Sequence, residues 1–277
     1  MLFIILTSCD RNSHYEPKDL RKLSEKELID AAEQNKDYKH HNTVYKNQFG
    51  EILSLDSLRK MKYPCLDHYI LDKYVDEEDQ ILEIIIRPAT QEDLELKAKI
   101  NLAFQEQPVI EAVEIDCDKI IEILDSIYVL DQGMRQNGQS IDHKIENQCL
   151  NKVISMIDKC GMPTLEEVDE HQMMTIWLVF QHAHHYIMKK YYPLLLQSAE
   201  KGDLKLSQMA LMKDRLLMRE GKPQLYGSQI QAGCKTQWEL YRLQNPETVD
   251  KRRAEMGLGP LKDYLSHYGI EFDVEQL

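Results

Sequence analysis

The spacing of hydrophobic residues along the chain changes near residue 90. Before this point, apolar pairs within residues 44–53 flank an Asn-Gln-Phe-Gly segment, and residues 74–86 repeat the arrangement around a run of acidic residues. This pattern predicts strand, turn and strand, and the second run is rich in β-branched residues. Residues 54–62 lie between the two and could form a short helix. We therefore predict a small α+β module over residues 41–90.

After this module, apolar residues recur every three or four positions almost to the C-terminus, which is the period of amphipathic helices. One helix should begin at Ser140 and end at Gly161. A capping box at Thr164 should open a second helix that runs to about Tyr191, and a third should stop at Gly221. Because the connections are short, we expect consecutive helices to pack as antiparallel neighbours.

The predicted fold is therefore mainly α, with a C-terminal antiparallel helical domain over residues 91–277 and the small α+β module at the N-terminal side. Residues 10–40 carry a mixture of acidic and basic side chains, which predicts a tether. Ser24 and Glu27 have capping-box spacing, so the tether should contain one helix over residues 24–34.

Residues 1–9 are an apolar run that ends in Leu6-Thr7-Ser8-Cys9. This ending resembles the lipobox of bacterial lipoproteins, in which a diacylglycerol is attached to the cysteine and the signal peptide is cut just before it. The run is too short to span a bilayer, and it lacks the basic start of a secretory signal, so we expect the natural chain to begin earlier. The resemblance implies an extracytoplasmic protein anchored to the membrane through lipidated Cys9. A chance apolar N-terminus with a buried cysteine is the alternative.

The chain carries 47 acidic residues against 34 basic ones, a formal net charge of −13. Such a surface repels phosphate backbones, so nucleic acid is not an expected partner. The cysteines other than Cys9 form no Cys-x-x-Cys pair, and Cys149 and Cys160 lie too far apart on one helix to pair with each other. Most of them are expected to be small buried side chains, with at least one free thiol. No cofactor is predicted.

An apolar segment, residues 173–180, runs directly into Gln181-His182-Ala183-His184-His185. If the helix continues, some of these polar groups are buried and need partners. His182 and His185 would then share a face. Three interpretations remain open: a satisfied hydrogen-bond network, a site that uses one imidazole as a general base, or a metal site on His182 and His185, for which spacing supplies no third ligand.

A second polar segment, residues 221–229, follows the helix that carries Asp214 and Arg215. Asp214 could orient an imidazole, and Arg215 could bind an anion. Gly227 would permit close backbone approach. Neutral donors and acceptors are supplied by Gln224, Tyr226, Ser228 and Gln229. The segment is either one wall of a ligand pocket or a polar loop that pins helices together.

Upstream, Asp131 and Arg135 have the i, i+4 spacing of a helix-surface ion pair, with Gln132 between them. An ion pair is the default interpretation of this spacing. If Arg135 instead points towards the same pocket as Arg215, an anionic ligand becomes more credible.

These residues occur in a fixed order that resembles an uncharacterised bacterial domain family with Gln-His-Ala-Asp and Tyr-Gly-Thr-Gln motifs. The matching segments are Asp131-Gln132-x-x-Arg135, Gly161-Met162-Pro163, Gln181-His182-Ala183, Asp214-Arg215, Gly221-x-Pro223-Gln224-x-Tyr226-Gly227-Ser228-Gln229, Val249-Asp250-x-Arg252-Arg253 and Gly257-Leu258-x-Pro260-Leu261. The resemblance covers residues 120–264 and implies that these polar residues form the family's site. Met162, His184 and Ser228 depart from the family's usual Trp, Asp and Thr. A mechanism that needs a carboxylate at position 184 is therefore not expected.

The sequence thus predicts a membrane-anchored lipoprotein whose helical domain binds a small polar ligand, with hydrolysis as one reaction that the site could support. His182 would be the acid/base, Asp214 its orienting partner, and Arg135 or Arg215 the anion contact. The other predicted ligand-binding residues are Asp131, Gln132, Gln181, Gln224, Tyr226, Gly227, Ser228 and Gln229. The competing prediction is a non-catalytic envelope interaction protein in which the polar cluster only stabilises the core.

Overall fold

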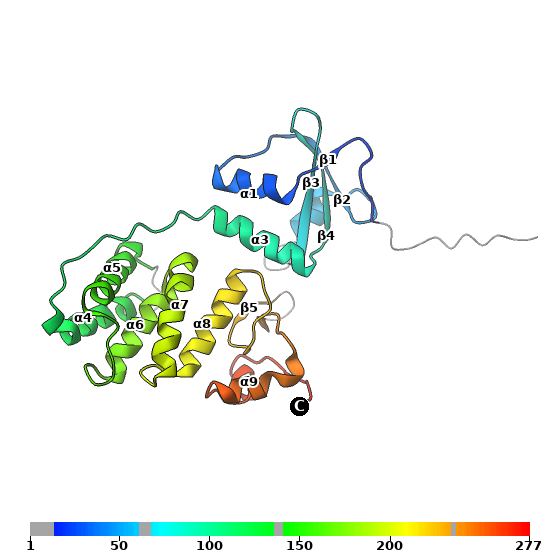
Figure 1. Cartoon of the computed structure of the whole chain (residues 1–277). Coiled ribbons are helices and arrows are strands. Elements are labelled where there is room, and N and C mark those ends of the chain that lie inside the picture. Colours follow the sequence, from blue (N-terminus) through cyan, green and yellow to red (C-terminus); the bar gives the residue numbers. More distant parts are fainter. Residues whose placement is uncertain (1–13, 61–67, 136–140, 234–236) are drawn as a thin grey trace, which may run out of the picture. The chain divides into compact units, whose positions relative to one another are not determined.

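The computed structural model describes residues 14–60, 68–135, 141–233 and 237–277 (Figure 1). The described residues separate into two compact units. The first comprises those up to Phe104 with the described part of Ala232–Gln237, and the second comprises Gln105–Gln231 with Trp238–Leu277. The predicted lipidation site Cys9 lies outside the described residues. Within the described part of the chain, no helix is long and apolar enough to cross a membrane.

The first unit is built on a four-stranded sheet of order β1-β3-β4-β2. Its strands are β1 (Arg21–Lys22), β2 (His40–Asn47), β3 (Tyr69–Val75) and β4 (Ile81–Pro88). The hairpin predicted within residues 74–86 is confirmed as the antiparallel pair β3–β4. The hairpin predicted within residues 44–53 is confirmed in part. Its turn is present and an antiparallel bridge joins Lys46 to Ile52, but residues 52–53 form no regular strand, and the main partner of β2 is β4, in parallel. Strand β4 lies between β3 and β2, and it is buried on both faces, at Ile84 and at Ile85.

Three helices complete the first unit: α1 (Glu25–Glu33), α2 (Leu55–Lys60) and α3 (Gln91–Ala103). The predicted capping box of Ser24 with Glu27 is present, and Thr90 forms another with Asp93. Helix α1 packs against α3, and Leu23 is buried in the core of the unit. Residues 21–34 are therefore part of a folded unit and not of a tether. The unit also extends through α3 to Phe104, beyond the predicted boundary at residue 90.

The second unit is helical. Its main helices are α4 (Ile120–Gly133), α5 (His143–Cys160), α6 (Glu170–His182), α7 (His185–Glu200) and α8 (Leu206–Arg219). Short elements precede or follow them: η2 (Cys117–Lys119), β5 (Ile230–Ala232), β6 (Trp238–Leu240), η4 (Pro246–Thr248), α9 (Val249–Glu255) and α10 (Leu261–Ser266). The prediction of a mainly helical chain with a small N-terminal α+β module is confirmed (Figure 1). The predicted helix start Ser140 lies outside the described residues, and α5 is capped by Asp142.

Side-chain contacts fix the directions of α4 to α8. The end of α4 meets the start of α5 where Arg135 contacts Glu146, and the start of α7 meets the end of α8 where Lys189 contacts Glu220. These two pairs are antiparallel, as predicted. Helices α4 and α6 instead run in parallel, because both their early and their late residues are in contact. Consequently the C-terminal ends of α4 and α6 lie at the same end of the bundle as the N-terminal end of α5.

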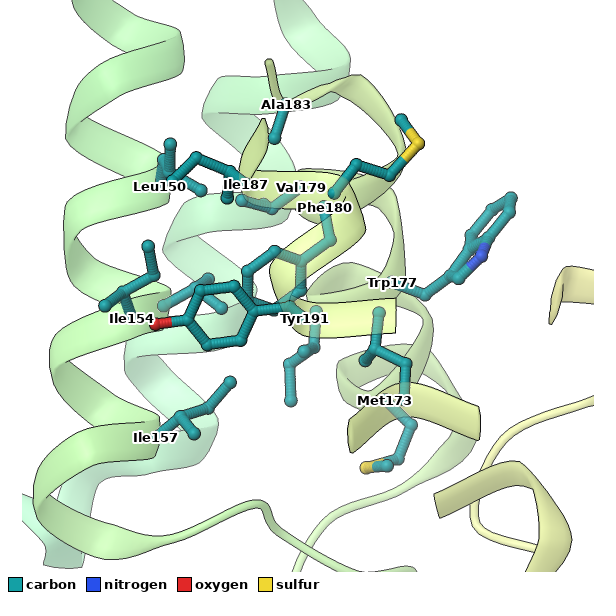
Figure 2. Packing of buried hydrophobic residues seen from close by; sticks show 14 of the residues in the cluster. Leu150, Ile154, Ile157, Met173, Trp177, Val179, Phe180, Ala183, Ile187 and Tyr191 are labelled. Atoms are coloured by element: carbon teal, nitrogen blue, oxygen red, sulfur yellow. The ribbon is translucent and has the colours of Figure 1, made fainter. Parts of the chain in front are cut away.

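The core between these helices is closely packed. Phe180 of α6 and Tyr191 of α7 stack with ring centroids 4.6 Å apart. Figure 2 shows Leu150, Ile154 and Ile157 of α5 lying alongside these rings. All five residues belong to one cluster of buried side chains that involves every main helix of the unit. This packing holds the polar ends of the helices in fixed positions.

The long helix predicted from Thr164 to Tyr191 is wrong, because it is two helices. Thr164 does bond to Glu167, but α6 begins only after Asp169, which accepts the first free backbone N–H groups. The helix then breaks at Ala183, whose φ of −62° and ψ of 163° are extended. His182 therefore ends α6 and His185 begins α7, so these two residues do not share a helical face.

A disulfide joins Cys117, just before α4, to Cys160 at the end of α5. This corrects the expectation that most cysteines are small buried side chains, since both of these residues are exposed. Cys149 fits the expectation: it is a buried free thiol, and burial raises its pKa to about 11. Cys65 and Cys234 lie outside the described residues.

Candidate functional site

Polar and charged side chains gather at the end of the bundle where α4, α6 and α8 finish and α5 and α7 begin. Arg135 and Glu146 bridge α4 to α5, and Arg215 donates from α8 to the backbone oxygen of Gln181 on α6 (3.1 Å). The helices that finish here present carbonyl oxygens and the negative ends of their dipoles, so cationic side chains are favoured. We call this group the bundle-end site.

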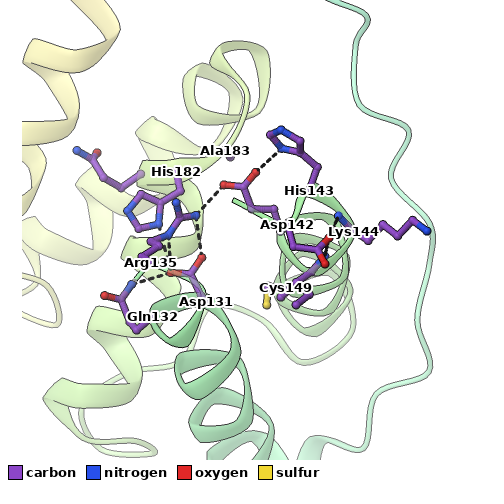
Figure 3. A network of polar contacts seen from close by, with 12 residues as sticks. Asp131, Gln132, Arg135, Asp142, His143, Lys144, Cys149, His182 and Ala183 are labelled. Carbon is purple, nitrogen blue, oxygen red and sulfur yellow. Dashed lines mark hydrogen bonds and ion pairs between the residues drawn. The ribbon is translucent and has the colours of Figure 1, made fainter. Parts of the chain in front are cut away.

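Asp131 is the centre of the bundle-end site (Figure 3). It is only 2 % exposed, and its carboxylate accepts from Gln132 Nε2 (2.7 Å) and from the guanidinium of Arg135. His182 Nδ1 lies 3.2 Å from Asp131 Oδ2. Burial alone would raise the pKa of Asp131, but the hydrogen bonds and charges of His182 and Arg135 lower it to about 2. Asp131 is therefore ionised at neutral pH, and His182 Nδ1 must be the donor.

Arg135 is neutralised by two carboxylates. It forms the predicted i, i+4 pair with Asp131 at 3.2 Å, and it also contacts Glu146 at 2.7 Å. The second oxygen of Glu146 in turn contacts His143 Nδ1 at 3.0 Å. Because both carboxylates are already bound to it, Arg135 fits the role of a structural bridge better than that of an anion contact.

The expected pairing of Asp214 with His182 is not found. Asp214 is fully buried, and its carboxylate accepts the backbone N–H groups of Leu225 (2.8 Å), Tyr226 (3.1 Å) and Ser228 (2.9 Å). Burial raises its pKa, and these hydrogen bonds oppose the rise. With three loop amides bound to it, Asp214 anchors the 224–229 loop, and Asp131 takes the place beside His182.

The 224–229 loop is held from several sides. Gln224 is fully buried: its amide donates to the backbone oxygens of Gln229 and Tyr241 and accepts from Gln229 N. Gly227 has a φ of +71°, and a Cβ there would lie 2.7 Å from a methyl group of Leu261. Three further side chains donate to backbone oxygens of the loop: Arg252, Arg253 and Tyr264. These contacts match the interpretation of a polar loop that pins helices together.

Part of the same loop nevertheless reaches the bundle-end site. Gln229 Oε1 accepts from Arg215 Nε (3.4 Å), and Gln229 Nε2 donates to Ser228 Oγ (3.0 Å). Arg215 therefore links the loop to the end of α6. The phenol of Tyr226 is half-buried, and burial raises its pKa. Of the predicted ligand-binding residues, Gln181, Arg215, Ser228 and Gln229 are brought together in one chain of contacts.

The break between α6 and α7 concentrates unsatisfied polar atoms. Among the described residues, Gln181 Oε1, His184 Nε2 and His185 Nδ1 are buried side-chain atoms without a hydrogen-bond partner. Buried polar groups in folded proteins nearly always have a partner, so three such atoms within five residues call for an explanation. Ordered water or a ligand would supply the missing donors and acceptors.

The predicted metal alternative loses its geometric basis. It required His182 and His185 on one helical face, but the break at Ala183 separates them. His182 Nδ1 faces Asp131, and His185 Nε2 lies 3.5 Å from Glu220. In the described part of the chain, no group of three or more His, Cys, Asp or Glu side chains is placed to hold a metal ion.

Two residues of the bundle-end site were not predicted from the sequence. Glu146 completes the Arg135 bridge, and Arg219 Nη1 donates to Ala183 O at 2.8 Å. Arg219 follows Arg215 by four residues on a helix, and this spacing on the same face could have signalled it. Glu146 lies on α5, and nothing in its local sequence points to Arg135.

The fold and the bundle-end site define a mainly helical domain that carries a charged polar cluster on one end of its bundle. The chain belongs to a family of unknown function (DUF6624), whose model matches residues 134–273. The match begins later and ends later than the predicted 120–264, so Asp131 and Gln132 precede it. No curated protein and no solved structure matches the chain.

Proposed function

We propose that the helical unit binds a small polar ligand at the bundle-end site, with His182 as the acid/base and Asp131 as its positioning partner. The observation that carries the proposal is the contact of His182 Nδ1 with Asp131 Oδ2. An ionised carboxylate on Nδ1 fixes the tautomer of the ring, so the lone pair of Nε2 is free to accept a proton. The side chain of His182 is 19 % exposed, so that solvent and a small ligand can reach it.

The same arrangement suits hydrolysis. His182 Nε2 could remove a proton from a water molecule, and Asp131 would stabilise the imidazolium that forms. A surface hollow of about 780 Å³, lined by residues that include Met134, Asp142 and His143, offers space at this end of α4 and α5. His182 is not among its lining residues, so the hollow borders the site without enclosing it.

We also propose that the protein is an extracytoplasmic lipoprotein, held to the membrane through a lipid on Cys9. The Leu-Thr-Ser-Cys segment supports this, and so does the disulfide between Cys117 and Cys160, because structural disulfides are typical of oxidising compartments. We expect the protein, expressed in bacteria behind a lipoprotein signal peptide, to sediment with membranes and its Cys9→Ser variant to become soluble. Equal sedimentation of both proteins would contradict the anchor.

The second candidate function is a non-catalytic envelope interaction protein. The observation that favours it is the number of polar atoms at the bundle end that already have protein partners, above all those of Asp131 and Arg135. In this case the charged network only fixes the helix ends, and His182 would matter for stability alone.

The variant His182→Ala separates the two candidates. Wild-type protein is screened by thermal shift against sugars, nucleotides and divalent metals, and a stabilising compound is then tested with the variant. We expect the variant to keep a melting temperature within a few degrees of wild type, because His182 is partly exposed, and to lose the ligand-induced shift. The control is His171→Ala, at the opposite end of α6. A retained shift, or unfolding of His182→Ala, would favour the structural role.

A further inference from the structure

Helix α8 places Arg215 and Arg219 one turn apart on the same face, against the break between α6 and α7. Arg215 Nη1 donates to Gln181 O (3.1 Å), and Arg219 Nη1 donates to Ala183 O (2.8 Å). Both side chains are half-buried. They cap carbonyl oxygens that the break leaves without intrahelical partners, which explains part of their position.

These hydrogen bonds to backbone oxygens leave the positive charges of Arg215 and Arg219 without a negatively charged partner in the described part of the chain. Within the described residues, no carboxylate lies at ion-pair distance from Arg215 or Arg219, whereas Arg87 and Arg135 each contact two. Glu146 is close enough to influence Arg219, but its oxygens contact Arg135 and His143. Removing an unpaired charge from water is costly, so an anionic partner would stabilise these two guanidinium groups.

Neighbouring positive charges further destabilise the charged forms of Arg215 and Arg219. Burial lowers the pKa of Arg215, and the charge of Arg135 lowers it further. Burial and then the charge of Arg215 do the same to Arg219. The charge of Arg135 is met by Asp131 and Glu146. Arg215 and Arg219, in contrast, place two guanidinium groups close together, without a carboxylate partner among the described residues, in a chain whose net charge is −13. An anion bound between them would relieve this repulsion.

His184 adds a donor beside Arg219. Its Nδ1 accepts the backbone N–H of Tyr186 (3.2 Å), so in the neutral ring the proton is on Nε2. That Nε2 is buried and has no partner among the described residues, which leaves a hydrogen-bond donor without an acceptor. Burial and the charge of Arg219 both lower the pKa of His184, which favours the neutral ring. His184 also caps α7, whose first turn has no acidic side chain to offset the positive end of the helix dipole.

At Arg215, Arg219 and His184, the groups left unmet by the described residues are positive charge and an N–H donor. We propose that Arg215, Arg219 and His184 Nε2 form an oxyanion subsite that binds a phosphate or carboxylate group of the ligand. Planar guanidinium groups match the geometry of either oxyanion. The N-terminal end of α7 adds to the attraction, and the C-terminal ends of α6 and α8 oppose it, so the two arginines supply most of the binding. This inference rests on the proposed ligand site and names the chemical class of its ligand.

The test is a titration of the folded protein with inorganic phosphate or with acetate, at an ionic strength held constant with chloride and followed by thermal shift. We expect one of the two anions to raise the melting temperature above the chloride control, and the responding anion tells phosphate from carboxylate. Arg219→Gln should weaken the binding by about tenfold or more, the cost of one charge-assisted contact. Arg219→Lys, which can still cap Ala183 O, should bind with intermediate affinity.

The matched control is Arg242→Gln, which removes the same charge from an exposed position of the same unit. It should bind the anion as wild type does. The subsite is disproved if neither anion exceeds the chloride control, or if Arg242→Gln loses as much affinity as Arg219→Gln. His182→Ala should keep the anion response, because it leaves all three donors in place. The subsite can therefore fail while the role of His182 stands, and the reverse also holds.

Discussion

Replacing Asp214 by alanine is expected to lower the free energy of unfolding by about 4 kcal/mol, because three buried N–H groups lose their acceptor together. Asp214 is fully buried, so water cannot replace the carboxylate without opening the loop. The loss should be measured by urea unfolding at pH 7, with the slope of the transition checked for a change in cooperativity.

Two further variants make this result interpretable. Asp214→Asn keeps one acceptor oxygen but turns an NH₂ group towards loop N–H groups. Its free energy of unfolding should therefore lie between those of Asp214→Ala and wild type. Asp158→Ala removes an exposed aspartate of α5 and should change the free energy of unfolding by no more than about 0.5 kcal/mol. A loss below about 1 kcal/mol for Asp214→Ala would show that the loop does not depend on this carboxylate.

The loop shows what local sequence can and cannot predict. A glycine helix stop followed by amides and hydroxyls correctly marked residues 221–229 as a polar element. It could not show whether those groups point towards a ligand or towards the protein, because the same amide can contact a ligand or hydrogen-bond to the backbone. Gln224 has a structural role, because its amide donates to the backbone oxygens of Gln229 and Tyr241 in the folded structure. Those contacts depend on chain segments that the local pattern does not contain.

Helix boundaries show the same limit. The start of α3 was predictable, because Thr90 and Asp93 carry the capping signal themselves. The break at Ala183 was not, since no glycine or proline marks it. The freed carbonyl oxygens of Gln181 and Ala183 are instead capped by Arg215 and Arg219, more than thirty residues further along the chain. A tertiary contact thus stabilises a helix end that local propensity would not produce.

The partner of His182 was mispredicted for a related reason. Two aspartates in the same set of motifs, Asp131 and Asp214, were equally suitable in chemistry. The choice between them depends on which helix end lies beside α6. Because α4 packs in parallel with α6, its last turn brings Asp131 to His182 across 51 positions of sequence. Spacing identified the residues of the site, and packing decided their pairing.

The role of Asp131 gives the second large expected effect. Its folded pKa is about 2, below the ordinary value of 3.8, and a depressed carboxyl pKa stabilises the fold above the unfolded pKa. A difference of nearly two units corresponds to about 2 kcal/mol at pH 7. This contribution should disappear as the pH falls from about 4 to about 2. We therefore expect Asp131→Asn to be less stable than wild type by about 2 kcal/mol at pH 7 and nearly equal to it near pH 2.

Urea unfolding of both proteins between pH 7 and pH 2 measures this difference directly. The two curves of stability against pH should converge on the acid side, because a protonated Asp131 no longer attracts His182 or Arg135 more strongly than an amide does. The control Asp158→Asn should follow wild type throughout, since its carboxylate is exposed. A gap that stays constant down to pH 2 would mean that Asp131 stabilises the site through its shape and hydrogen bonds. Its negative charge would then contribute nothing to the free energy of unfolding, and the proposed electrostatic attraction between Asp131 and His182 would be contradicted.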